Sequence, residues 1–175
     1  RLPAAVMLEA VDHVVFERNT FRHMGAGGLL LYMGTHDNSI VGNVFTDISG
    51  TAIAVDMNLE GNPADARKIC KRDTIRNNLI KTVAQDFGVA IHAAYTEAIT
   101  IEHNEVSETP YTGILVGWGW ADVPNAANNN LIRYNEIHHV TSRLCDAGGV
   151  YTLSRQPGTL IAENYIHDLP HVYPG

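Results

Sequence analysis

The sequence predicts an all-β protein, a right-handed parallel β-helix of about six coils with a column of asparagines in its interior. Three observations support this prediction. A phrase of the form apolar-x-x-Asn-x-apolar occurs six times along the 175 residues. A glycine followed by an alternating apolar run comes after five of these six asparagines. Between the two phrases there is no stretch of about ten residues with helical periodicity, so each repeat holds two or three short strands.

The asparagine phrase marks one repeat per coil of the predicted solenoid. Its six asparagines are Asn19, Asn43, Asn78, Asn104, Asn135 and Asn164, with successive steps of 24, 35, 26, 31 and 29 residues. Each strand of such a solenoid pairs with its counterpart one coil away, about 4.8 Å along the axis. We therefore expect the asparagine amides to stack as a ladder and to bond the backbone at a bend.

The glycine phrase predicts which side chains face outward. Alternation places the first and third residues after each glycine inward and the second and fourth outward. The five glycines are Gly28, Gly50, Gly88, Gly113 and Gly149. Predicted inward residues are Leu29, Leu31, Ile114, Val116, Val150 and Thr152. Predicted outward residues include Leu30, Tyr32, Ala52, Ala54, Ala90, His92, Leu115, Tyr151 and Leu153.

The uneven steps favour a β-helix over a leucine-rich repeat, because extra residues can leave a β-helix as loops at its turns. We expect loops at 58–71 and 121–130 and a smaller bulge at 143–147. Residues 1–175 are predicted to form a single domain. Since neither end shows a polar cap, we expect this segment to be part of a longer helix with further coils of the same chain.

Composition excludes several classes of protein. Apolar residues make up 45% of the chain and charged residues 18%, which excludes intrinsic disorder. A net charge of −7 argues against nucleic acid or an acidic membrane as a partner. No apolar run approaches the roughly 18 to 20 residues of a membrane-spanning helix. The two cysteines, Cys70 and Cys145, do not form a disulfide framework or a metal-ligand spacing.

Aromatic residues gather beside the small outward residues of the middle coils. Tyr32, His92 and Tyr151 would border a shallow trough there, and the string YTGILVGWGW adds Tyr111, Trp118 and Trp120. Exposed tryptophans beside a trough are typical of sites that stack on the apolar face of a sugar ring. The alternative is that the two indoles only cover the edge of the sheet.

Asp146 is the most informative acid. It precedes two glycines and an outward tyrosine in DAGGVYT, where the glycines would allow a tight turn and the close approach of a ligand. A carboxylate there could be an acid, a nucleophile or a metal ligand, or it could only cap the turn. Asp86 and Asp122 lie near strand ends on the same side.

Three other acids have a simpler explanation. They share with His23, Thr82 and His139 the position four residues after a ladder asparagine, which indicates a turn role common to all repeats. These acids are Asp47, Glu108 and Asp168.

The histidine pattern predicts no metal site and the motifs predict no cofactor. The nine histidines lack an HExxH spacing or a cysteine cluster. No GxGxxG, GxxxxGK[ST] or Gly-x-Ser-x-Gly motif occurs, so nothing supports nucleotide binding or serine-hydrolase chemistry.

Over essentially its whole length the chain resembles the pectate-lyase-like superfamily of right-handed parallel β-helix proteins. The strings YTGILVGWGW and DAGGVYTLSRQPGTLIAENYIHD look most like bacterial β-helix glycoside hydrolases of the α-L-fucosidase and xylanase type. This resemblance implies an oligo- or polysaccharide substrate, a secreted or periplasmic location and two catalytic carboxylates. Asp146 would be one of the two, with its partner on the next coil, after Gly175.

Two other functions remain open. A polysaccharide lyase or epimerase of the same fold would need a basic residue and calcium or arginine near a uronate, and Arg155 is the one candidate just past the outward strand face. A non-catalytic carbohydrate-binding or tailspike-like segment would need the aromatic trough but not Asp146. The predicted substrate-binding residues are Trp118, Trp120, Tyr151, His92, Tyr111, Asp122 and Arg155.

Overall fold

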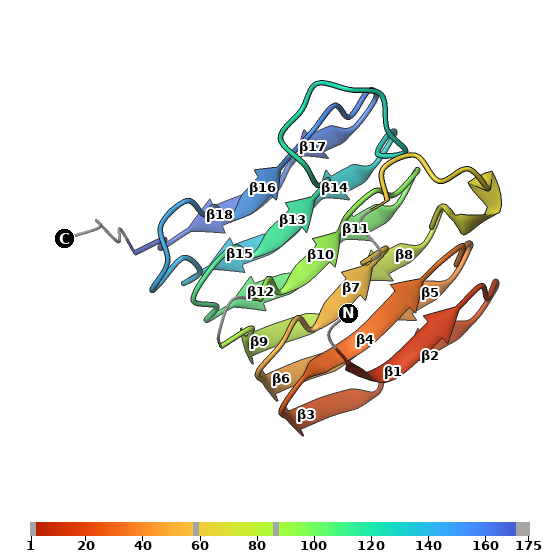
Figure 1. Cartoon of the computed structure of the whole chain (residues 1–175). Coiled ribbons are helices and arrows are strands. Elements are labelled where there is room, and N and C mark those ends of the chain that lie inside the picture. Colours follow the sequence, from red (N-terminus) through yellow and green to blue (C-terminus); the bar gives the residue numbers. More distant parts are fainter. Residues whose placement is uncertain (1–2, 58–59, 86–87, 171–175) are drawn as a thin grey trace.

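The computed structural model describes residues 3–57, 60–85 and 88–170, and these form a right-handed parallel β-helix of six coils. Figure 1 shows the coils stacked in sequence order, from β1 to the coil that holds β16, β17 and β18. Every coil contributes one strand to each of three six-stranded parallel sheets. The predicted fold class and number of coils are therefore confirmed.

The strands of each sheet follow one another from coil to coil. The first sheet contains β1 (Ala4–Glu9), β4 (Gly27–Tyr32), β7 (Ile53–Val55), β10 (Ile91–Ala93), β13 (Ile114–Val116) and β16 (Val150–Thr152). The second contains β2 (Val15–Glu17), β5 (Ser39–Val41), β8 (Thr74–Arg76), β11 (Thr100–Glu102), β14 (Leu131–Arg133) and β17 (Leu160–Ala162). The third contains β3 (Thr20–Met24), β6 (Val44–Ile48), β9 (Leu79–Val83), β12 (Glu105–Ser107), β15 (Glu136–His138) and β18 (Tyr165–His167).

The asparagine ladder runs through the bend between the second and third sheets. The Asn78 Nδ2 donates to Asn104 Oδ1 over 2.9 Å, and the Asn104 Nδ2 donates to Asn135 Oδ1 over 3.0 Å. The same Asn104 amide also donates to the Ile75 carbonyl over 2.9 Å. Asn19, Asn43 and Asn164 continue the column in the same way. The predicted interior ladder is confirmed, and it satisfies buried amides that would otherwise be costly.

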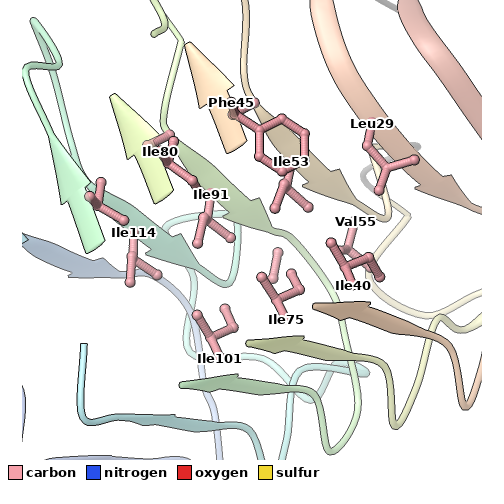
Figure 2. Packing of buried hydrophobic residues seen from close by; sticks show 14 of the residues in the cluster. Leu29, Ile40, Phe45, Ile53, Val55, Ile75, Ile80, Ile91, Ile101 and Ile114 are labelled. Carbon is pink, nitrogen blue, oxygen red and sulfur yellow. The ribbon is translucent and has the colours of Figure 1, made fainter. Parts of the chain in front are cut away.

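Isoleucine stacks fill the space between the sheets. Ile40, Ile75 and Ile101 lie in register on successive coils of the second sheet, and all three are fully buried. Figure 2 shows these side chains pointing toward Leu29, Ile53, Ile91 and Ile114 of the first sheet. The core is therefore a set of aliphatic columns parallel to the helix axis, which a regular repeat of apolar residues produces.

The predicted outward direction is wrong for two residues. Ala52 and Ala90 belong to the buried core, because Ile53 pairs with Leu29 of β4 and Ile91 pairs with Ile53, which places both alanines level with Gly28. The chain bends inward at this level. A Cβ added at Gly28 would lie 2.6 Å from the Ala52 carbonyl oxygen, so only small residues fit.

Thr152 keeps the predicted inward direction, because it pairs in register with the core residue Val116, but its side chain is exposed. It lies on β16, the last strand of the first sheet, which has no following strand to cover it among the described residues.

The position four residues after each ladder asparagine has the same backbone conformation in all six coils, near the end of a third-sheet strand or directly after it. His23, Asp47, Thr82, Glu108, His139 and Asp168 all have φ between 49° and 56°, in the left-handed region. The predicted turn role of this position is confirmed. It also explains three of the acids without any catalytic function.

The predicted loops lie outside the strands. The first contains a short 3₁₀ helix, η1 (Ala66–Lys68), and its residues 58–59 lie outside the described residues. The second covers 121–130 with no named strand. The bulge at 143–147 is fixed at its start, where the backbone amides of Arg143 and Leu144 both donate to the Pro110 carbonyl over 3.0 Å. Within the described part of the chain, no helix is long and apolar enough to cross a membrane.

Candidate functional site

A pocket of about 470 Å³ lies against the outer face of the first sheet. Its floor includes Leu115 of β13, and the turns that lead into β4, β7 and β10 form one side. Six of the eight residues that the sequence singles out as catalytic or sugar-binding line this pocket. They are His92, Tyr111, Trp118, Trp120, Asp146 and Tyr151.

Asp146 lies in the turn that connects β15 to β16, with φ of 55°. The hydroxyl of Tyr151 donates to its Oδ1 over 3.2 Å. Among the described residues this is the one hydrogen bond to the carboxylate, so no backbone amide supports the turn-cap interpretation. The exposed carboxylate is oriented by a side chain of β16 and faces the pocket.

The glycines after Asp146 serve packing rather than the approach of a ligand. Gly149 is buried, and a Cβ added there would lie 2.6 Å from Cγ2 of Ile166. The carbonyl of Gly148 accepts from the Gly113 amide over 3.2 Å and continues the first sheet. The expectation that these glycines admit a ligand is therefore wrong for Gly149.

Two tyrosines surround the carboxylate. Partial burial and the nearby charge of Asp146 raise the pKa of Tyr111. The same two causes, burial first, raise the pKa of Tyr151. Both phenols therefore keep their protons at neutral pH and can donate hydrogen bonds at the rim of the pocket.

The two tryptophans differ in exposure. Trp120 is 77% exposed, whereas Trp118 is half-buried. Their ring centroids are 5.4 Å apart in an edge-on arrangement, and the Trp118 ring lies 5.5 Å from that of His92. The exposed Trp120 face suits stacking on a ligand. Trp118 also acts as a cover over the sheet, which is the alternative interpretation for both.

Alternation predicts His92 on the open outer face, but the residue is buried, at 5% exposure. The outward direction is right, and Trp118 covers the imidazole. Burial lowers the pKa of His92 to about 4, so the ring is neutral at physiological pH. Its Nε2 has no hydrogen-bond partner among the described residues.

Asp122 and Arg155 do not line the main pocket. They line a neighbouring, more open hollow of about 410 Å³, which shares Trp120 and Leu153 with the pocket. Trp120 therefore stands between two hollows. Among the described residues, Arg155 forms no salt bridge.

Asp56, which directly follows β7, is a residue that the sequence pattern does not single out. It is 3% exposed, and its carboxylate accepts a hydrogen bond from the Tyr95 amide over 3.2 Å. Burial raises its pKa to about 7. Asp56 does not line the pocket, although the next residue, Met57, does. The signal that could have found it is an aspartate directly after an apolar strand. Asp86 lies outside the described residues.

The described residues offer little for a metal. Nowhere in 3–57, 60–85 and 88–170 do three His, Cys, Asp or Glu side chains come together as ligands. Cys70 is buried and Cys145 is exposed, and both are free thiols.

Comparisons with known proteins agree with the fold. The family described as "Right handed beta helix region" matches residues 3–126. A solved structure named "Glycoside hydrolase" superimposes with a TM-score of 0.91 and 36% sequence identity over 95% of this chain. This chain spans 30% of the length of that protein. A search of curated proteins finds no match.

Proposed function

Since the chain belongs to the right-handed β-helix family, we propose that it is a carbohydrate-active domain of a glycoside hydrolase. The observation that carries the proposal is a carboxylate, Asp146, held by Tyr151 at the rim of a pocket with tryptophans on its wall. The likeness to a solved structure that is named a glycoside hydrolase supports the same class of enzyme.

Sugar binding would use the aromatic wall. An indole face covers the axial C–H groups of a pyranose, and the ring hydroxyls then point toward polar side chains. Trp120 offers an exposed face for this contact, while Tyr111 and Tyr151 offer phenol groups. No lysine or arginine is among the described lining residues, which favours a neutral sugar in this pocket.

The catalytic step would use Asp146 as one of two carboxyl groups. Glycoside hydrolysis needs one acid to protonate the leaving oxygen and one carboxylate to act as a nucleophile or to activate water. Asp146 is the one carboxylate among the described lining residues. We place its partner on a further coil, at roughly 5 to 5.5 Å for a retaining enzyme or 6.5 to 9.5 Å for an inverting one.

Further coils of the same chain are part of this proposal. Ile161 and Ile166 of the sixth coil are 45% and 41% exposed, whereas their register partners Ile132 and Ile137 are fully buried. A seventh coil would cover both isoleucines and would extend the first sheet beside Asp146. Residues 1–175 would then be one segment of a single domain.

The finer assignment follows the resemblance of the two sequence strings. We propose an enzyme of the α-L-fucosidase or xylanase type that acts on plant or other complex polysaccharides outside the cytoplasm. The described pocket is consistent with a single neutral ring, since its 470 Å³ lies within the usual range of small-molecule sites.

The test is digestion of a panel of glycans by the longest natural chain that contains residues 1–175. The panel contains neutral xylans and fucosylated glycans together with uronate polymers, each with and without calcium. We expect hydrolysis of a neutral substrate without calcium. Calcium-dependent cleavage of a uronate polymer with an unsaturated product would indicate a lyase, and binding without any product would indicate a non-catalytic segment.

A further inference from the structure

The imidazole of His92 occupies an unusual position on the outer face of the first sheet. Its register partners on the adjacent coils are Ala54 and Leu115, and neither has a polar side chain. The nearest ring is the indole of Trp118, 5.5 Å away and tilted by 45°. A polar ring is therefore buried in an apolar column, and its Nε2 has no hydrogen-bond partner among the described residues.

Such an arrangement lowers the stability of the fold, so it calls for a purpose other than packing. About nine in ten or more of the buried polar groups in proteins are hydrogen-bonded, and each exception calls for an explanation, of which a functional role is one. A leucine would fit the column at this level, because Leu30 and Leu115 occupy equivalent positions on other coils. Packing alone gives no reason for a histidine here.

The position of His92 relates it to the ligand site. It lines the same pocket as Asp146, and the ring that covers it, Trp118, also lines that pocket. Trp118 is only half-buried and does not belong to the hydrophobic core cluster. A ligand that displaces the indole would meet the imidazole directly.

We infer that His92 determines the specificity of the pocket by forming a hydrogen bond from its Nε2 to a hydroxyl group of the bound sugar ring. This inference rests on the proposed carbohydrate function and adds the chemistry of one position of the ligand. Trp118 moves aside when the ring enters and then packs against it.

Because the imidazole is neutral, it restricts the class of ligand that can bind at this position. Burial keeps the ring neutral above about pH 4, so it offers one donor or one acceptor without a positive charge. A sugar hydroxyl can serve as either partner. A uronate carboxylate would gain no charge pairing from this ring, and among the described lining residues it would meet Asp146 as the charged group. The site therefore selects a neutral, hydroxyl-bearing ring.

The test compares His92→Leu with wild type, both in the longest natural chain that contains residues 1–175, in two measurements on the same samples. Tryptophan fluorescence follows titration with methyl α-L-fucoside, methyl β-D-xyloside and D-galacturonate, and thermal unfolding gives the Tm. We expect His92→Leu to raise the Tm by a few degrees and to weaken binding of the neutral glycoside by about 3- to 10-fold. His92→Asn, which keeps a donor and an acceptor, should recover part of the affinity.

His103→Leu is the matched control. This exposed histidine follows β11 on the second sheet and stacks on Tyr134, outside the pocket. Its substitution should leave the affinity unchanged.

The outcomes separate this inference from the proposed function. If no sugar changes the fluorescence of the wild-type chain, both fail. If the neutral glycoside binds and His92→Leu binds it equally well, only the role of His92 is wrong. A lower Tm or failure to fold in His92→Leu would show a structural role for the ring and overturn the inference. Stronger binding of galacturonate than of the neutral glycosides would overturn it as well.

Discussion

Two regions of the molecule differ in how regularly their side chains repeat from coil to coil. One is the interior of the bend between the second and third sheets, and the other is the outer face of the first sheet. In the interior every coil places an asparagine at the same level, and each amide is bonded to its neighbours and to the backbone. On the outer face the residue type changes along one column, with a leucine, an alanine, a buried histidine, a second leucine and a tyrosine on successive coils. The regular column stabilises the fold. The irregular one forms the pocket, because a ligand site requires side chains that the repeat does not supply.

The largest expected effect is at Asp146. In the longest natural chain, Asp146→Asn should lower glycoside hydrolysis by about 10²- to 10⁴-fold or more, because an amide can neither ionise nor give up an acidic proton. The free energy of unfolding should change by less than about 0.5 kcal/mol, since the side chain is exposed and asparagine tolerates the φ of 55°.

Asp47→Asn is the control for this change, because Asp47 is an exposed aspartate with a similar φ of 53° on the third sheet, outside both hollows. The rate of glycoside hydrolysis, measured for both variants, tests the catalytic role of Asp146. Unchanged hydrolysis by Asp146→Asn would reduce Asp146 to a structural turn residue.

Asp56 is a buried acid that lies outside the regular asparagine column. Burial raises its pKa from 3.8 to about 7, so between these values the folded protein holds a proton that the unfolded chain has released. Stability therefore falls as the pH rises from about 4 to about 7. The loss is at most about 4 kcal/mol. Asp56→Asn should be close to wild type at pH 4 and clearly more stable at pH 8 in denaturant unfolding.

A constant difference between Asp56→Asn and wild type from pH 4 to pH 8 would contradict the raised pKa.

The asparagine ladder should show a gradient along the axis. Asn104→Ala leaves neighbouring amide and backbone groups unpaired in the interior and should cost about 1 to 3 kcal/mol. Asn164→Ala should cost less, because Asn164 is half-buried on the last described coil. Urea unfolding of both variants measures the difference. Equal costs, or none, would mean that the ladder does not stabilise the central coils.

The two tryptophans are expected to differ in their effect on stability. Trp120→Ala should weaken glycan binding while it changes the free energy of unfolding by less than about 1 kcal/mol, since the indole is 77% exposed. Trp118→Ala should weaken binding and also destabilise the fold more, because it uncovers His92. Thermal unfolding and glycan titration of both variants test this order. A large loss of stability in Trp120→Ala would assign that ring to the core.

The features that the sequence predicts correctly are mostly those that repeat in every coil. The ladder, the number of coils and the left-handed turn position recur in every coil, so their spacing in the sequence is sufficient to predict them. Alternation also gives the outward direction of His92 correctly. It cannot give its burial, because the covering residue, Trp118, comes from the loop of the next coil.

The features that the sequence does not predict depend on contacts between coils. Ala52 and Ala90 are inside because the strands shift by two residues relative to their glycines, and only pairing reveals such a shift. Asp56 is buried by its surroundings rather than by its own position in the repeat. Arg155 and Asp122 lie in a separate hollow. The sequence shows that they are near Trp120, but it does not show on which side of that ring they lie.

Mapping a bound sugar onto the described residues tests the central claim most directly. The claim is that the irregular outer face of the first sheet binds glycans while the regular columns only support it. In heteronuclear NMR spectra of the chain titrated with the best glycoside of the panel, we expect shifts at the Trp118 and Trp120 indoles and at Tyr151. The side-chain amides of Asn78 and Asn104 should stay unchanged. Shifts confined to the second or third sheet, or none with any glycan, would contradict the account.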